Sequence, residues 1–241
     1  MFNIIIAENY DQVSSEAFKI MREVVRKEAP VLGLATGSSP VGLYKKMIAD
    51  HNSNGTSYKN CITFNLDEYI GLPKNHEQSY WTFMHENLFD NIDIPEENIH
   101  IPAGDKEDEE KECVEYETAL AAHVVDLQVL GIGSDGHIAF NEPGASFDSV
   151  THIMELTEQT RRDNARFFDD DITQVPTHAI TMGLASIMRA RKIIVIATGA
   201  NKADAVYGMI KGPKTTDCPA SILQDHDDVT VILDPAAAAR L

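Results

Sequence analysis

The strongest constraint on the fold is the alternation of short apolar runs with helical patterns along the chain. Strand-like runs fall at residues 3–7, 31–35, 61–66, 125–132, 192–198 and 229–233, and helical patterns lie at residues 12–28, 41–52, 78–89, 109–122 and 202–211. Such alternation is typical of a parallel sheet with helices on both faces. We therefore expect an α/β fold with an open, mainly parallel, Rossmann-like sheet. Ligands of such sheets bind beyond the carboxyl ends of the strands.

Length and composition favour one domain spanning residues 1–241, because no Pro/Gly/Ser-rich linker divides the chain. No apolar run approaches the roughly 20 residues that span a membrane, and the start, MFNIIIAENYD, resembles a first strand more than a signal peptide. We expect a cytoplasmic protein without a membrane partner. The formal charge of −18 argues against nucleic acid as a partner. The three cysteines show no spacing of a disulfide framework or of a zinc site.

The first candidate loop follows the run at 31–35 and reads LATGSSPVGLY. Free backbone N–H groups, the hydroxyls of Thr36, Ser38 and Ser39, and a helix start at Pro40 together favour an anion site, with Gly37 in the turn. A helix cap with a tight turn and no ligand is the alternative. The pattern is not a nucleotide-binding P-loop, because no Gly-Lys-Ser/Thr follows.

The second candidate loop reads FNLDEYIG and places Asp67 and Glu68 directly after the run at 61–66. An exposed acid pair is usually only solvated loop. A strand-end acid near a phosphate-type loop is nevertheless a reasonable general base, since partial burial raises its pKa.

The third candidate loop is GIGSDGHIAFNEP, at the end of the run at 125–132. Gly133 and Gly136 permit the turn, and Asp135 lies close enough in sequence to orient one ring nitrogen of His137. Glu142 is placed to fold back toward the same imidazole. Carboxylates stabilise the protonated form of a histidine between them, which suits a proton shuttle. A purely structural histidine is the alternative.

Two cations complete the candidate site. Arg166 is flanked by apolar residues in NARFF, where solvation is expected to be poor, and Lys202 falls in the first turn of a predicted helix in ATGANKA. A lysine there opposes the helix dipole, so a bound anion explains it better than helix stability does. Both residues are candidate phosphate ligands, although Lys202 also fits an exposed surface lysine.

These pieces together resemble the family of glucosamine-6-phosphate isomerases and deaminases, which also includes 6-phosphogluconolactonases. The motifs LATGSSPVGLY, FNLDEYIGL, SYWTFM, GIGSDGHIAFNEPG, NARFF, QVPTHAITMG and ATGANKA carry the resemblance over nearly the whole chain. The continuation FNEP after DGHIA favours the deaminase branch, because the lactonases continue differently. The resemblance implies a hydrolase of amino-sugar catabolism that converts D-glucosamine 6-phosphate to D-fructose 6-phosphate and ammonia without a cofactor.

The resemblance also implies a role for each candidate. His137 would assist opening of the sugar ring, with Asp135 and Glu142 orienting it, and Asp67 would move a proton from C2 to C1 through an enolamine. The 6-phosphate would bind to the first loop and the two cations, namely Thr36, Gly37, Ser38, Ser39, Arg166 and Lys202.

One segment departs from the allosteric members of the family, whose effector site after the N-E-P motif carries a serine, an arginine and a lysine. Here Ala145, His152 and Met154 align with those three. The end of the chain at 234–241 is also shorter than the tail that contributes to that site. We therefore expect a monomeric enzyme that N-acetylglucosamine 6-phosphate does not activate.

Two other functions fit parts of the pattern. A 6-phosphogluconolactonase would share the phosphate loop and His137 but has no evident need for Asp67 as a carbon base. A sugar-phosphate-sensing regulatory domain would need a DNA-binding module, and the sequence has neither a helix-turn-helix extension nor a basic face.

Overall fold

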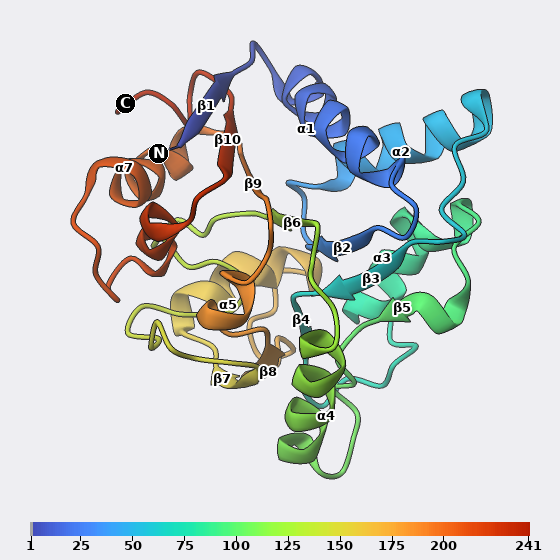
Figure 1. Cartoon of the computed structure of the whole chain (residues 1–241). Helices are drawn as coiled ribbons and strands as arrows, with labels where there is room; N and C mark the ends of the chain where they lie inside the picture. The colour runs from blue at the N-terminus through green and yellow to red at the C-terminus, as the bar shows by residue number, and fades with distance from the viewer. Residues whose placement is uncertain (1) are drawn as a thin grey trace.

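Seven strands form one parallel sheet in the computed structural model, which describes residues 2–241 (Figure 1). All six neighbouring pairs are parallel. In spatial order the strands are β1 (Asn3–Ile6), β10 (Val229–Leu233), β9 (Ile193–Ala197), β6 (Leu127–Leu130), β2 (Val31–Leu34), β3 (Ile62–Asn65) and β5 (Ile99–His100).

The centre of this sheet is covered on both faces. Every residue of β2, β6, β9 and β10 is buried, although successive side chains of a strand point to opposite faces. The predicted α/β architecture with an open, mainly parallel sheet is therefore confirmed. Six strand-like runs of the sequence lie in strands of this sheet.

Helices connect the strands, and several begin where a polar side chain caps the first turn. Asn9, Ser79, Asp108 and Thr157 each accept a hydrogen bond from a backbone N–H of the helix that follows. The α-helices are α1 (Tyr10–Val25), α2 (Val41–Asn54), α3 (Tyr80–Asn87), α4 (Glu109–Ala121), α5 (Glu158–Asn164), α6 (Leu184–Ile187) and α7 (Ala203–Lys211). Short 3₁₀ helices are η1 (Phe89–Asn91), η2 (Glu96–Asn98), η3 (Ala165–Phe167), η4 (Ala200–Lys202) and η5 (Pro219–Asp225). Within residues 2–241, no helix has the length and apolar character needed to cross a bilayer.

A second, three-stranded antiparallel sheet lies beside the first, and the sequence pattern did not predict it. Its order is β4 (Asp67–Tyr69), β8 (His178–Thr181), β7 (His152–Glu155). Each strand has only three or four residues and mixes polar with apolar side chains, so no clear period marks it. The prediction of Asp67 and Glu68 as a loop was wrong, because both belong to β4.

The order of the strands places a ligand site between β2 and β6. From β2 the chain continues to β3 on one side, whereas from β6 it continues to β9 on the other. Such a switch in direction leaves a crevice outside the carboxyl ends of the two strands. The first and third candidate loops leave β2 and β6 at this point.

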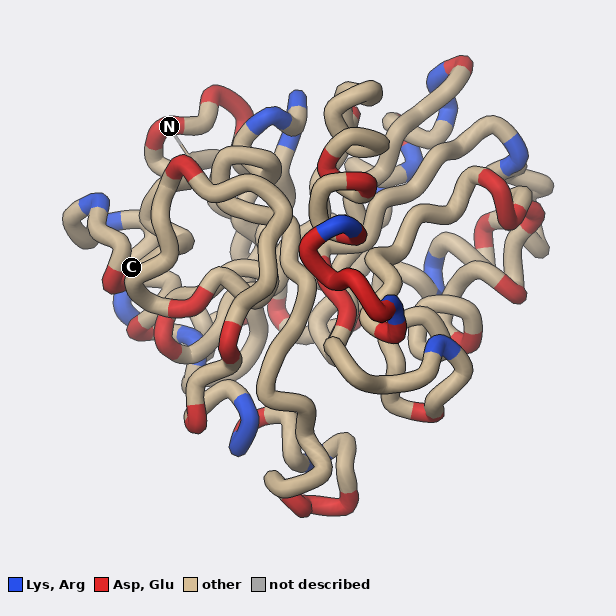
Figure 2. Tube along the Cα trace, turned by 90° about the horizontal axis from the view of Figure 1, so that it is seen from below, with Lys and Arg blue, Asp and Glu red and all other residues tan. Residues whose placement is uncertain are grey.

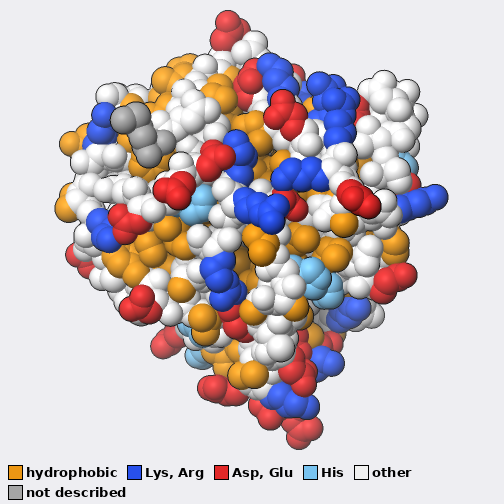
Figure 3. Space-filling model, in the orientation of Figure 1, with side chains coloured by type: hydrophobic (Ala, Val, Ile, Leu, Met, Phe, Trp, Pro, Cys, Tyr) orange, Lys and Arg blue, Asp and Glu red, His pale blue; other side chains and the backbone are white. Residues whose placement is uncertain are grey.

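The charge of the chain is spread along its outer loops. Figure 2 shows acidic positions on most peripheral segments, and Figure 3 shows Lys and Arg side chains interspersed with acids and hydrophobic groups on the face seen in Figure 1. An anionic substrate must therefore be held by local donors against the overall charge of −18.

Candidate active site

One pocket of about 530 Å³ brings the three candidate loops and both cations together. Its lining includes almost all the predicted site residues, namely Thr36, Gly37, Ser38, Ser39, Asp67, His137, Arg166 and Lys202. Asp135 and Glu142 are not part of this lining, and both lie behind His137. The pocket opens at the switch point of the large sheet, as the strand order requires.

The first loop forms a tight turn between β2 and α2. Gly37 has φ of 84°, which favours glycine, and Pro40 occupies the helix cap position without a side-chain cap. Tyr10 of α1 braces the turn, since its hydroxyl donates to the Ser38 carbonyl at 2.8 Å and accepts from the Gly42 N–H at 2.8 Å. The loop thus keeps a fixed shape at the start of a helix, where an anion is favoured.

Asp67 lies in the pocket wall and is 6% exposed. Burial is the larger cause that raises its pKa to about 8, and the neighbouring carboxyl group of Glu68 is the smaller one. β4 is held in place by antiparallel pairing, in which Asp67 faces Thr181 of β8. A rigid strand therefore presents a carboxyl group that is a much stronger base than an exposed aspartate.

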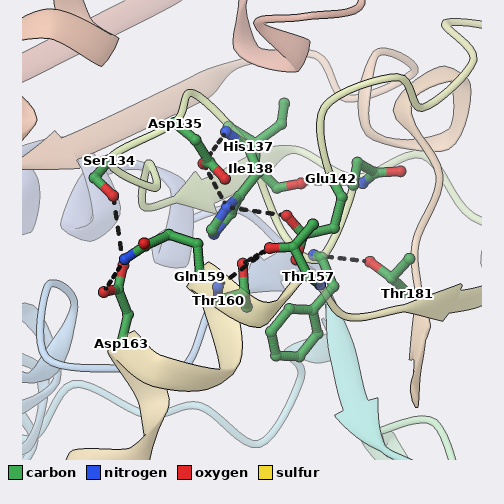
Figure 4. A network of polar contacts seen from close by, with 12 residues as sticks. Ser134, Asp135, His137, Ile138, Glu142, Thr157, Gln159, Thr160, Asp163 and Thr181 are labelled. Atoms are coloured by element: carbon green, nitrogen blue, oxygen red, sulfur yellow. Dashed lines mark hydrogen bonds and ion pairs between the residues drawn. The ribbon is translucent and has the colours of Figure 1, made fainter. Parts of the chain in front are cut away.

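Asp135, His137 and Glu142 form a close cluster (Figure 4). The Nδ1 atom of His137 lies 2.7 Å from Oδ1 of Asp135 and 3.7 Å from Oε2 of Glu142. Both carboxylates therefore lie close enough to the ring to stabilise its protonated form. Burial raises the pKa of Asp135, but the hydrogen bonding and charge of His137 outweigh burial and leave that pKa below its ordinary value.

Glycines shape the histidine loop in two ways. Gly136 has φ of 89°, as the turn requires. Gly133 does not have a positive φ; a Cβ there would lie 2.3–2.6 Å from ring atoms of His137. The glycine at 133 is therefore needed for the close approach of the imidazole rather than for the turn.

Glu142 joins the histidine cluster to α5. It is 3% exposed, and its Oε1 accepts from the backbone N–H of Thr157, the cap residue of α5, at 3.2 Å. Figure 4 shows this contact beside the histidine. The carboxylate of Glu142 therefore contacts both His137 and the start of α5, the helix that precedes Arg166.

The two cations reach the pocket from different elements. Arg166 lies on η3 and Lys202 at the end of η4, just before α7 rather than within its first turn. The expected poor solvation of Arg166 was wrong, because the residue is exposed and its guanidinium lies 4.7 Å from the Phe167 ring centre. Burial lowers the pKa of Lys202, and the nearby charge of Arg166 lowers it further.

Several pocket residues escaped the sequence reasoning. Tyr69, Tyr80 and Phe140 pack together as one aromatic wall, with ring centres 4.8–5.9 Å apart. Asp163 of α5 also lines the pocket, near Lys202. Tyr80 and Phe140 lie inside the motifs SYWTFM and FNEP, so those motifs were the available signal.

The cluster of Asp135, His137 and Glu142 is also the group within residues 2–241 that has the donors for a metal ion. One ligand atom from each lies within 4.8 Å of the others. Two carboxylates and one imidazole match the donor preference of several divalent ions.

The fold and the pocket together define a class of α/β enzymes that act on sugar phosphates. In this class an anion-binding loop lies at the switch in strand order, and acid–base groups lie beside it. The chain belongs to the family described as glucosamine-6-phosphate isomerases/6-phosphogluconolactonase, whose sequence model matches residues 7–232.

Relatives within the family are close. A glucosamine-6-phosphate deaminase of Clostridium botulinum (strain Alaska E43 / Type E3) is 49% identical over 240 residues, covering 99% of this chain and 96% of the relative. Glucosamine-6-phosphate deaminase 2 of Bacillus subtilis (strain 168) is 48% identical over 241 residues, covering 99% and 97%.

Solved structures agree with this grouping. A monomeric glucosamine-6-phosphate deaminase superposes with a TM-score of 0.97 at 40% identity, covering 100% of both chains. The 6-phosphogluconolactonase of Trypanosoma brucei has a TM-score of 0.82 at 20% identity, covering 100% of this chain and 99% of that one. The second likeness concerns the fold alone.

Proposed function

We propose that this chain is a glucosamine-6-phosphate deaminase, which converts D-glucosamine 6-phosphate and water to D-fructose 6-phosphate and ammonia. The observation that carries the proposal is the buried carboxyl group of Asp67, in the same pocket as His137, Lys202 and the phosphate-type loop. The close relatives named for this activity support it.

The phosphate end of the substrate binds where positive charge and free N–H groups meet. Lys202 supplies a point charge and Arg166 a planar fork of donors, and the loop at residues 36–39 supplies hydroxyls and the start of α2. Binding there fixes the sugar so that its first two carbons reach the acid–base groups.

His137 acts first, by moving a proton between O1 and the ring oxygen as the pyranose opens. Asp135 and Glu142 stabilise the charged imidazole during this step. The orientation of the ring is fixed by Asp135, which also accepts a hydrogen bond from the backbone N–H of His137 at 3.1 Å.

Asp67 then performs the carbon chemistry. Its carboxylate removes the proton from C2, giving an enolamine, and returns that proton to C1, giving an imine at C2. Water adds to the imine carbon and ammonia leaves, so the balance is one water consumed for each ammonia released. A base with a pKa near 8 is well matched to a weak carbon acid.

A direct assay separates this proposal from the lactonase alternative. Purified protein with EDTA receives glucosamine 6-phosphate in one tube and 6-phosphogluconolactone in another. We expect equal release of ammonia and fructose 6-phosphate in the first tube and no hydrolysis above background in the second. Lactone hydrolysis without ammonia release would replace the proposal, and Asp67→Asn serves as the inactive control.

We also propose that the enzyme is monomeric and not activated by N-acetylglucosamine 6-phosphate. Ala145 is buried, and His152 and Met154 lie on β7. Alanine and methionine carry no charge, so two of the three positions offer no cation to a second phosphate. Rate curves that stay hyperbolic with and without that compound would support this. A sigmoidal curve that the compound makes hyperbolic would refute it.

A further inference from the structure

Glu68 is a buried carboxyl group that the proposed reaction does not use. It follows Asp67 on β4 and is 4% exposed. Successive residues of a strand point to opposite faces, so Asp67 faces the pocket while Glu68 faces the start of α3. Burying a second acid directly behind a general base is costly unless hydrogen bonds compensate the lost hydration of its carboxylate.

The carboxylate of Glu68 is fully engaged by backbone donors. Oε1 accepts from the N–H groups of Tyr69 at 2.8 Å and Tyr80 at 2.9 Å, and Oε2 accepts from the N–H of Trp81 at 2.9 Å. Tyr80 and Trp81 are the first two residues of α3, which also places Tyr80 and Phe83 in the pocket wall. Glu68 therefore connects β4, the strand that carries Asp67, to α3, the helix that contributes Tyr80 and Phe83 to the pocket wall.

These contacts favour the charged form of Glu68. Burial raises its pKa to about 7, and the three N–H groups oppose that rise, while the charge of Asp105 adds to it. A proton on either oxygen would compete with an N–H donor already in place. The two acids titrate as a coupled pair, and the three N–H donors favour the negative charge on Glu68 over a negative charge on Asp67.

The other titratable groups around Asp67 do not supply this charge. Tyr69 of β4, Tyr80 of α3 and Tyr116 of α4 lie close enough to sense Asp67, and burial raises the pKa of each phenol, so they remain neutral. His137 faces Asp67 across the pocket, with its own two carboxylates behind it.

The geometry points to Glu68 as a positioning residue for Asp67: its buried carboxylate fixes the first turn of α3 against β4 and supplies the negative charge that keeps Asp67 a strong base. This role rests on the proposed function, because it assigns Asp67 the proton transfer. Glu68 itself does not touch the substrate.

The test is the pH profile of kcat/KM for ammonia release by Glu68→Gln. We expect its acid limb to move about one pH unit toward acid, and the plateau value of kcat to fall about threefold because the base is weaker. The matched control is Ser79→Ala. It removes the other cap of the same helix, the Oγ that accepts from the Thr82 N–H at 3.1 Å, without removing a charge.

A merely structural role predicts a different pattern. In that case Ser79→Ala lowers turnover as much as Glu68→Gln does, and the acid limb of each variant stays within about 0.3 pH unit of the wild type. This combination of results would overturn the proposal. If Glu68→Gln does not fold, Glu68→Asp replaces it, because it keeps the charge but shortens the side chain. Its limb should stay in place while kcat/KM falls, and a limb moved by a full unit would overturn the proposal.

A second readout does not depend on turnover. Asp67→Asn should raise the Tm at pH 8, and that gain should shrink by about a quarter in the Glu68→Gln background, since removing the charge of Glu68 brings the pKa of Asp67 about one pH unit back toward its ordinary value. An unchanged gain would overturn the role of Glu68. Shrinkage in a protein that releases no ammonia would refute the proposed function and leave the coupling between the two acids standing.

Discussion

Asp67→Asn should abolish deamination and at the same time stabilise the folded protein. The carboxyl group is almost fully buried, and its pKa is raised from the ordinary 3.8 to about 8 by burial and then by Glu68. An acid whose pKa is higher in the folded than in the unfolded state favours folding fully below the unfolded value and loses that contribution as the pH rises toward the folded value. The asparagine has no charge to bury at any pH.

The size of the effect follows from the pH interval. Between the unfolded pKa and pH 8 lie about four pH units, and each is worth about 1.4 kcal/mol, so the wild type forgoes about 5 to 6 kcal/mol that the variant keeps. For a chain of this length, 1 kcal/mol shifts Tm by about 2–4 °C. We therefore expect Tm to rise by about 10–20 °C at pH 8 and by only a few degrees at pH 5.

Calorimetry at both pH values measures the gain, and ammonia release measures the loss of activity. Asp227→Asn is the control, because that aspartate is exposed and its substitution should move Tm by no more than about 1 °C. A Tm at pH 8 equal to or below that of the wild type would refute the buried, high-pKa description of Asp67. Near-normal turnover would remove Asp67 from the proposed mechanism.

Three further predictions concern the two ends of the pocket. Lys202→Ala should raise KM for glucosamine 6-phosphate about tenfold with a smaller change in kcat, because it removes a proposed phosphate ligand from the pocket wall; an unchanged KM would place the phosphate elsewhere. Asp135→Asn should lower kcat about a hundredfold, since His137 loses the carboxylate 2.7 Å from its ring, and kcat within twofold of wild type would contradict this. EDTA should leave turnover unchanged, whereas added zinc should inhibit by binding Asp135, His137 and Glu142. If EDTA instead suppressed turnover and added zinc restored it, the enzyme would require a metal ion and this prediction would be wrong.

The large sheet and two of the site loops were predictable because their signals are local. The strand at 31–34 is a continuous apolar run, and the strand at 127–130 is apolar except for Gln128. Both are followed by glycine and small polar residues, and a parallel sheet brings such ends to one edge. The predicted approach of Glu142 to His137 is present, at 3.7 Å. Sequence could place these groups because each is fixed by its distance from a strand end.

The features that sequence did not predict depend on contacts between distant segments. β4 becomes a strand only because residues 178–181 pair with it, and nothing in Asp-Glu-Tyr shows a strand period. Tyr10 braces a loop that begins 25 residues later in the chain, and the burial of Glu68 depends on the start of α3. The exposure of Arg166 likewise follows from the path of η3, not from its apolar neighbours.

The two sheets contribute different groups to the pocket. The phosphate loop and His137 follow strands of the large parallel sheet, whereas Asp67 belongs to the small antiparallel one. A change confined to β4 is therefore expected to alter the proposed proton transfer at carbon and to leave the proposed phosphate-binding loop intact. Evolution can reuse such a scaffold in steps, keeping recognition of a phosphorylated sugar while the chemistry is exchanged, or dropped altogether to leave a receptor for the same molecule.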